Sequence, residues 1–203
     1  MTAHAKLEKR HRLTPEVRRE QIVAAAGRLI LAQRHLPLPL ESLARDAGVS
    51  KALIYAYFPT QHDLFNAVLA SDFETMATRG IEAASRRASL ADAALETALA
   101  YHDHVAENGP LAHIVLRDAY MAGRVSRPVA AFRDAIVRRL ARLARLELSV
   151  EANENIAAIN LITTIPEQCG RLVWQGDMTP ERGRQLCAEL IASSLSALRP
   201  RAG

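Results

Sequence analysis

The sequence has 203 residues, 49% of them hydrophobic, and a mean hydropathy of −0.03, a composition that excludes a disordered chain and a membrane protein. Residues 156–165, one of the longest strongly apolar stretches, are interrupted by polar residues and fall short of the about 20 residues that a membrane-spanning helix needs. The net charge of +4 originates in the first 60 residues, where ten Lys or Arg face five Asp or Glu, and this asymmetry favours a polyanionic partner.

Two features indicate where the protein works. The charged N-terminus lacks the apolar core of a secretion signal, so we expect a cytoplasmic protein. Cys169 and Cys187 are too few for a disulfide framework and too far apart for a metal-binding pair, so we expect both to be reduced and buried. We expect no metal and no other cofactor.

Three helices are predicted within the first 60 residues. The first begins at Thr14, a hydroxyl N-cap that is followed by a proline and an acid. The second runs from Pro39 to Gly48, a residue suited to the left-handed position after a helix. Ser50 caps the third helix, which stops before Pro59 because a residue preceding proline is pushed away from helical geometry.

Six further helices are predicted, so the expected fold class is all-α with about nine helices. Thr60 and Asp63 form a capping pair for the fourth helix, which we expect to run to Arg87 with Gly80 as its weak point and to join two domains. Pro166 lies inside the penultimate helix and removes a backbone hydrogen bond, so we expect a kink there. The other helices are expected over residues 89–108, 110–123, 126–148, 149–176 and 179–199.

Residues 43–58 have the pattern of a helix-turn-helix. A turn containing glycine sets two short helices at a steep angle, so that the second can enter the major groove of DNA. The bulky apolar residues pack inward, which leaves Lys51, Ala52, Tyr55 and Tyr57 outside. The lysine can bind phosphate or guanine, the alanine permits close approach, and the tyrosines offer a hydroxyl and a ring edge. An exposed helix with solvated polar residues would show the same pattern.

A dense set of residues around this segment follows one known pattern: Ala44, Ala47, Gly48, Val49, Ser50, Lys51, Tyr55, Tyr57, Phe58, Leu64 and Phe65. On these residues, the stretch 14–72 resembles the DNA-binding domain of the TetR family of transcriptional regulators. The resemblance implies a homodimeric repressor that binds a palindromic operator and is released by a small, largely apolar molecule. It implies a helix-turn-helix domain with a basic N-terminal arm over residues 1–60, and a helical effector-binding and dimerisation domain over residues 61–203.

The chain departs from the family pattern at several positions of the DNA-binding domain. Pro39 and Gln61 stand where the family often has residues that contact phosphate, Leu53 where a small or hydroxyl residue is usual, and Ala56 where a histidine is common. Backbone anchoring is therefore expected to be weaker, and the basic N-terminal arm can compensate for it. The residues expected to contact DNA are Ser50, Lys51, Ala52, Leu53, Tyr55, Tyr57, Gln61 and Arg12.

In the family, a ligand bound among the C-terminal helices tilts the fourth helix and changes the spacing of the two recognition helices. The candidate ligand-binding residues here are polar or aromatic residues on otherwise apolar helices: Tyr101, His104, His113, Tyr120, Phe132, Asn160, Thr164 and Gln168. The last two helices are expected to form the dimer. The apolar residues offered for it are Leu172, Val173, Leu186, Leu190, Ile191, Leu195 and Leu198.

An enzyme is not expected. His102 and His104 cannot bind one metal ion together with Glu107, because residues two apart on a helix point about 200° apart. The sequence has no glycine-rich phosphate loop and no nucleophile elbow. Two alternatives remain open: a DNA-binding regulator that is controlled by a protein partner or acts as an activator, without a small-molecule effector, and a helical enzyme or lipid carrier that borrowed the fold.

Overall fold

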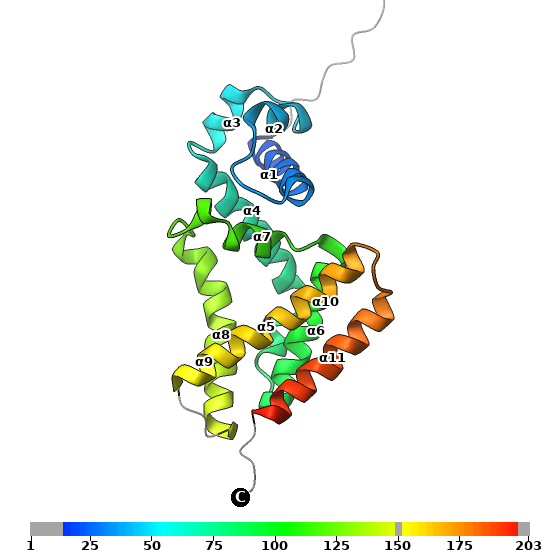
Figure 1. Ribbon diagram of the computed structural model, residues 1–203. Coiled ribbons are helices and arrows are strands. Elements are labelled where there is room, and N and C mark those ends of the chain that lie inside the picture. Colours follow the sequence, from blue (N-terminus) through cyan, green and yellow to red (C-terminus); the bar gives the residue numbers. More distant parts are fainter. Residues whose placement is uncertain (1–13, 149–151, 199–203) are drawn as a thin grey trace, which may run out of the picture.

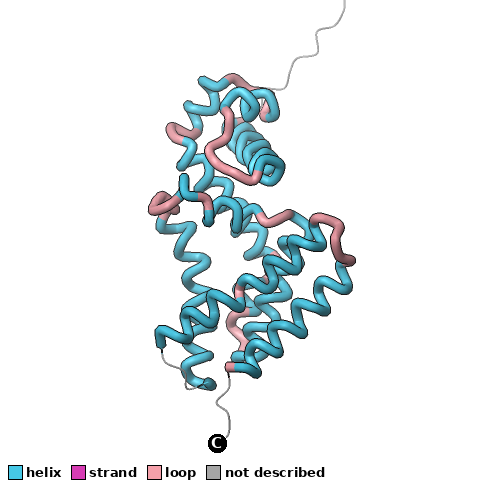
Figure 2. Tube along the Cα trace, viewed as in Figure 1, coloured by secondary structure: helices cyan, strands magenta, loops and turns pink. Residues whose placement is uncertain are grey.

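The computed structural model describes residues 14–148 and 152–198. Over these residues the chain forms eleven α-helices and one short 3-10 helix and no strand, which confirms the all-α fold class. Figure 1 shows the N-terminal helices at one end of the molecule and the later helices at the other, with α4 reaching between them. Figure 2 shows that short loops connect them. The helices are α1 (Pro15–Gln33), α2 (Leu40–Asp46), α3 (Lys51–Tyr57), α4 (Gln61–Thr78), α5 (Ile81–Ala84), α6 (Leu90–Asn108), α7 (Leu111–Arg117), η1 (Ala119–Met121), α8 (Arg127–Leu148), α9 (Ala152–Ile162), α10 (Thr164–Trp174) and α11 (Pro180–Ala197).

The starts of several helices lie where their capping residues predicted them. Ser50 Oγ accepts a hydrogen bond from the Leu53 N–H, 3.1 Å away, at the start of α3. Thr60 and Asp63 form a complete capping box at the start of α4. Hydroxyl caps also begin α1, α6 and α11. Because a cap is a contact between near neighbours, these boundaries can be predicted from the sequence.

Helices α1 to α4 share one core. Ile22, Leu43, Ile54 and Phe65 come from these four helices in turn, and each is at most 2% exposed. Burying such a side chain fully stabilises the fold by about 1.5–3 kcal/mol. The core therefore holds α2 and α3 in a fixed position against α1 and α4.

The predicted long helix over residues 60–87 is wrong, because it breaks at Gly80. Helix α4 ends at Thr78, and Gly80 takes a φ of +84°, in the left-handed region that cannot continue a right-handed helix. The short helix α5 begins at the next residue, Ile81. Ile81 and Ala84 of α5 are buried, so burial of this turn supports the break.

The predicted penultimate helix is also divided, into α9 and α10, at Thr163. Pro166 has no N–H with which to bond the carbonyl of Ile162, which is the last residue of α9. The hydroxyls of Thr163 and Thr164 donate to the carbonyls of the residues three before them, at 2.8 Å and 2.6 Å. The expected kink is thus an interruption, and the two breaks account for the eleven α-helices in place of about nine.

The predicted helix over residues 110–123 ends early, at Arg117. The Asp118 carboxylate accepts hydrogen bonds from the Tyr120 N–H, 2.9 Å away, and from the Leu36 N–H, 2.8 Å away. The first bond caps η1, and the second joins this segment to the loop between α1 and α2. Asp118 therefore links the N-terminal helices to the later ones.

The later helices pack around α6. A Cβ added to Gly170 of α10 would lie 2.7 Å from the carbonyl oxygen of His102, and one added to Gly183 of α11 would lie 3.0 Å from Nε2 of the same residue. Glycine at these two positions permits the close approach of α10 and α11 to α6. No helix in the described part of the chain has the length and apolar character needed to cross a membrane.

Candidate functional site

Helices α2 and α3 form a helix-turn-helix at the end of the molecule (Figure 1). Gly48 in the turn has a φ of +62°, as predicted for the left-handed position, and the Val49 N–H bonds the Ala44 carbonyl at 2.9 Å. Ile54 and Phe58 are 2% and 3% exposed, so the apolar side of α3 is packed against the core. The opposite side of α3 faces outward.

The outward side of α3 carries Lys51, Ala52 and Tyr55, all exposed, with Tyr55 at 50%. Lys51 Nζ lies 2.6 Å from Oε1 of Glu41 on α2. The hydrogen bond from Lys51 lowers the pKa of the Glu41 carboxyl, and the same contact raises the pKa of the Lys51 ammonium. Both side chains are more than half exposed, so the pair contributes little to stability.

A cavity of about 660 Å³ lies among helices α4 to α11. Its volume falls within the about 300–1,000 Å³ typical of small-molecule sites. Its walls are mainly apolar and aromatic, with Phe73, Met76, Leu116, Leu140 and Leu195 among them. These helices can therefore enclose an organic molecule.

The segment that contains the helix-turn-helix matches a known family. Residues 22–68 match the model of "Bacterial regulatory proteins, tetR family". This segment is therefore a DNA-binding helix-turn-helix domain of the TetR family.

Solved structures of TetR-family regulators are similar in fold over nearly the whole length of the chain. A TetR-like regulator from Rhodococcus sp. RHA1 is 18% identical, with a TM-score of 0.69 over 91% of this chain and 99% of its own. A TetR-family regulator from Streptomyces coelicolor is 16% identical, with a TM-score of 0.66 over 91% and 97%. FadR from Bacillus subtilis, in complex with stearoyl-CoA, is 15% identical, with a TM-score of 0.64 over 91% and 99%. These likenesses show the fold; no curated protein sequence matches the chain.

The other residues expected to contact DNA in this TetR-family domain lie in different surroundings. Leu53 and Tyr57 are half-buried, and Ser50 is exposed with its hydroxyl capping α3. Both polar atoms of the Gln61 amide are bonded to the Leu38 backbone, since Oε1 accepts from its N–H and Nε2 donates to its carbonyl, each at 2.9 Å. Gln61 therefore braces α4 against the segment before α2. Arg12 lies outside the described residues.

Five of the eight expected ligand-binding residues line the cavity: Tyr101, His113, Phe132, Asn160 and Thr164. Burial is the main cause that raises the pKa of the Tyr101 hydroxyl well above its usual range. Tyr101 is half-buried, and the part of its side chain that stays accessible lines the cavity. The ring of Phe132 stacks on that of Phe73, with 5.1 Å between centroids.

The other three expected ligand-binding residues are not among the residues that line the cavity. Tyr120 stacks on His62 with 4.4 Å between ring centroids, near the start of α4. Gln168 donates to Glu167 at 2.6 Å and accepts from Arg171. His104 is hydrogen-bonded to Asp72 of α4.

Glu167 of α10 is a lining residue that the sequence analysis missed. It is 2% exposed, and its Oε2 accepts from Gln168 and lies 3.4 Å from His113 Nδ1. Its Oε1 is buried and has no hydrogen-bond partner among the described residues, and the same holds for Thr97 Oγ1. The local sequence gives no clear signal for it, because the segment from Ile162 to Val173 also contains Thr163, Thr164, Gln168 and Arg171.

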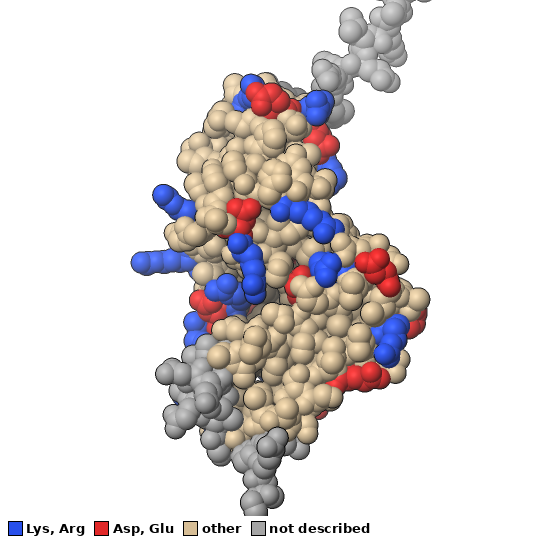
Figure 3. Space-filling model, in the orientation of Figure 1, with Lys and Arg blue, Asp and Glu red and all other residues tan. Residues whose placement is uncertain are grey.

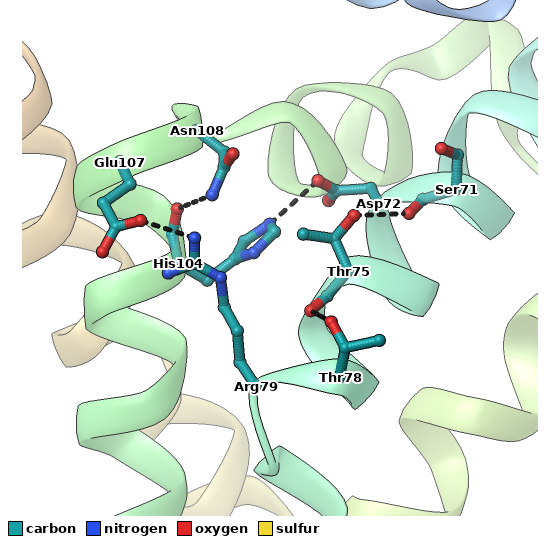
Figure 4. Close-up of polar contacts among 8 residues, drawn as sticks. All are labelled: Ser71, Asp72, Thr75, Thr78, Arg79, His104, Glu107 and Asn108. Atoms are coloured by element: carbon teal, nitrogen blue, oxygen red, sulfur yellow. Dashed lines mark hydrogen bonds and ion pairs between the residues drawn. The ribbon is translucent and has the colours of Figure 1, made fainter. Parts of the chain in front are cut away.

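Two polar contacts join α6, which lines the cavity, to α4 (Figure 4). His104 Nε2 donates to Asp72 Oδ1 at 2.9 Å, and both side chains are at most 5% exposed. Arg79 donates to Glu107 at 2.5 Å; this hydrogen bond raises the pKa of Arg79 and lowers that of Glu107. Because α4 also belongs to the N-terminal core, these contacts form a physical link between the cavity and α3.

A second link joins the start of α4 to the segment after α7. Asn66 Nδ2 donates to the Arg124 carbonyl at 2.9 Å, and the Ser126 N–H donates to Asn66 Oδ1 at 2.7 Å. His62 Nε2 lies 3.2 Å from the Tyr120 carbonyl. A displacement of α7 or α8 by a bound molecule would therefore act directly on α4.

Proposed function

We propose that the protein is a homodimeric, ligand-responsive repressor that binds a palindromic operator and is released when a small molecule fills the cavity. The observation that carries the proposal is the contact chain from the cavity-lining helix α6, through His104 and Asp72, to α4 and the helix-turn-helix. The function implies a cytoplasmic location, where DNA is accessible.

The exposed side of α3 supports direct DNA binding. Lys51, Ala52 and Tyr55 lie within one turn of each other and project from a helix held by a buried core. A charge-assisted bond from Lys51 to DNA requires its transfer from Glu41 to a phosphate or a guanine. Ser50, Leu53 and Tyr57 flank these residues and complete the proposed contact surface.

The proposed dimer forms through α10 and α11, which lie side by side at one side of the molecule (Figure 1). Three of the seven apolar residues considered for it, Ile191, Leu195 and Leu198, line the cavity of their own protomer. The remaining four, namely Leu172, Val173, Leu186 and Leu190, are half-buried or exposed, with Leu190 at 41%. These four are the proposed dimer contacts.

The cavity favours a small-molecule effector over a protein partner, because its apolar walls would stay hidden from a protein. FadR from Bacillus subtilis was solved with stearoyl-CoA, which supports the capacity of this fold to hold a ligand with a long hydrocarbon chain. Regulation then follows from linkage. A ligand that prefers the DNA-free arrangement lowers DNA affinity by the same factor by which DNA lowers ligand affinity.

The experiment begins with selection of bound fragments from a genomic DNA library by the purified full-length protein. Binding to the recovered fragment is then titrated at several salt concentrations, and the mass of the complex gives the number of protomers. A palindromic footprint bound by a dimer, with affinity falling steeply as salt rises, supports the proposal. Binding with neither sequence preference nor salt dependence would overturn it.

A further inference from the structure

The cavity combines apolar walls with one deeply buried acid. Its polar lining residues at the exposed side include Arg117, Arg133 and Asp134, and the last two are paired at 3.1 Å. Figure 3 shows Lys and Arg side chains gathered at the level of α7 and the upper part of α8. Glu167 is 2% exposed and far less accessible than these groups. The positive charge of the lining is therefore at the outside and the acid is inside.

Glu167 has one oxygen in use and one without a partner. Oε2 accepts from Gln168 Nε2 at 2.6 Å and lies 3.4 Å from His113 Nδ1, a half-buried side chain that also lines the cavity. Oε1 is buried with no partner among the described residues. Buried carboxylates are costly unless they are paired and hydrogen-bonded, so this oxygen is a position that a ligand donor would satisfy.

Other residues around Glu167 also favour a ligand that carries a hydrogen-bond donor or a positive charge. Thr97 Oγ1 lines the cavity and is also without a partner in the described part of the chain, and it can accept from an N–H group. The ring of Tyr101 has its accessible surface toward the cavity, and Phe73 and Phe132 stack nearby in the wall. Aromatic faces attract a cation that has lost its water shell. No Lys and no Arg that lines the cavity is buried, within the residues that the structure describes.

We propose that the ligand is an apolar organic amine whose protonated nitrogen binds the free oxygen of Glu167 while its hydrocarbon part fills the cavity. The proposal rests on the proposed function for its regulatory consequence, but the binding itself requires no DNA. An alkyl carboxylate or a fatty acyl chain would leave Glu167 without a donor and place an anion or a methyl group against it. Such ligands are therefore rejected from the inner end.

The test uses one hydrocarbon chain with three head groups. Isothermal titration of the full-length protein with decylamine, decanol and decanoate, below their micellar concentrations at pH 7, measures the effect of the head group alone. We expect decylamine to bind about tenfold or more tighter than decanol, with decanoate weakest, as for a hydrogen bond to a charged group. Equal binding of the three, or tighter binding of decanoate, would overturn the proposal.

Two matched variants locate the effect. Glu167→Gln should reduce the preference for decylamine over decanol to within about threefold. Glu74→Gln makes the same substitution at an exposed position of α4 outside the cavity lining and should retain the full preference. An unchanged preference in Glu167→Gln would contradict the assignment. If Glu167→Gln lacks the helical circular dichroism of the wild type, the head-group series on the wild-type chain decides alone.

A separate measurement distinguishes this inference from the proposed function. Decylamine is added to the protein bound to its selected DNA fragment. Release of the DNA supports both the amine ligand and the proposed ligand-controlled repression. Selective binding of decylamine without release retains the Glu167 assignment and counts against ligand-controlled repression, whereas release by decanoate and not by decylamine supports the repressor and overturns the amine.

Discussion

His104 Nε2 donates a hydrogen bond to Asp72 Oδ1 across a distance of 2.9 Å, and each residue keeps a second polar atom buried without a partner in the described part of the chain. The pair joins α6 to α4 in the interior, where both side chains are at most 5% exposed. The Arg79–Glu107 pair joins the same two helices at the surface. The two pairs therefore make a matched comparison of buried and exposed links.

The Asp72→Ala variant should be less stable than wild type by about 1–3 kcal/mol, because it leaves the buried His104 N–H without an acceptor. Arg79→Ala removes an exposed pair and should cost at most about 1 kcal/mol. Urea unfolding of the two variants, followed by circular dichroism, measures both values. In a DNA-binding assay, Asp72→Ala should also weaken the effect of the ligand on affinity. Equal losses of stability in the two variants would contradict a special role for the buried pair.

The Lys51→Ala variant should weaken binding to the selected DNA and reduce the slope of log affinity against log salt by about 1, if the lysine contacts a phosphate. Glu41→Gln should strengthen binding, because Lys51 then no longer has to leave a carboxylate before it contacts DNA. Fluorescence anisotropy at several salt concentrations measures both changes. Weaker binding in Glu41→Gln would show that the acid positions Lys51 for DNA and does not compete with it.

The features predicted well from sequence depend on near neighbours. Ser50 as a cap, the Thr60–Asp63 capping box and Gly48 at the left-handed position each follow from residues within a few positions of one another. Sequence alone does not show which side of α6 or α10 faces inward. The sequence pattern therefore places His104 in the cavity although its partner stands 32 positions earlier, and it does not single out Glu167.

Two glycines show that helix breaks, too, cannot be predicted from local sequence alone. Both Gly27 and Gly80 stand in helical sequence patterns, yet α1 continues through the first and α4 ends before the second. Gly27 has helical geometry, and an added Cβ would meet Leu111 Cδ2 at an ordinary 3.6 Å. Gly80 has a φ of +84°, with nothing within 4 Å of an added Cβ. The difference lies in backbone conformation and in the burial of α5, which no local pattern reveals.

Alanine substitution should therefore act in opposite directions at these positions. Gly27→Ala should stabilise the protein by about 0.4–1 kcal/mol, because alanine favours the helix and restricts the unfolded chain. Gly80→Ala should destabilise it by about 1–2 kcal/mol, because the left-handed conformation is unfavourable for alanine. Thermal unfolding of both variants at one protein concentration provides the comparison. Stabilisation by Gly80→Ala would mean that the long helix predicted from the sequence forms after all.

The thiol of Cys187 supplies a pH-dependent test of the packing of α11 against α6 and α10. Burial is the main cause that raises its pKa to about 12, and burial also raises the pKa of Cys169. A thiol with a raised pKa remains protonated, so Cys187 of the folded protein should react hardly at all with a disulfide reagent between pH 7 and pH 9. In the unfolded chain, where cysteine has a pKa of about 8.5, the rate of reaction should rise nearly tenfold per pH unit up to that value.

Because the unfolded state releases the thiol proton first, the free energy of unfolding should also fall as the pH rises from about 8.5 towards 12. Counting reacted thiols with and without denaturant checks the first expectation, and urea unfolding at pH 8 and pH 10 checks the second. Rapid modification of both cysteines in the folded protein at pH 8 would show that α11 separates readily from its neighbours.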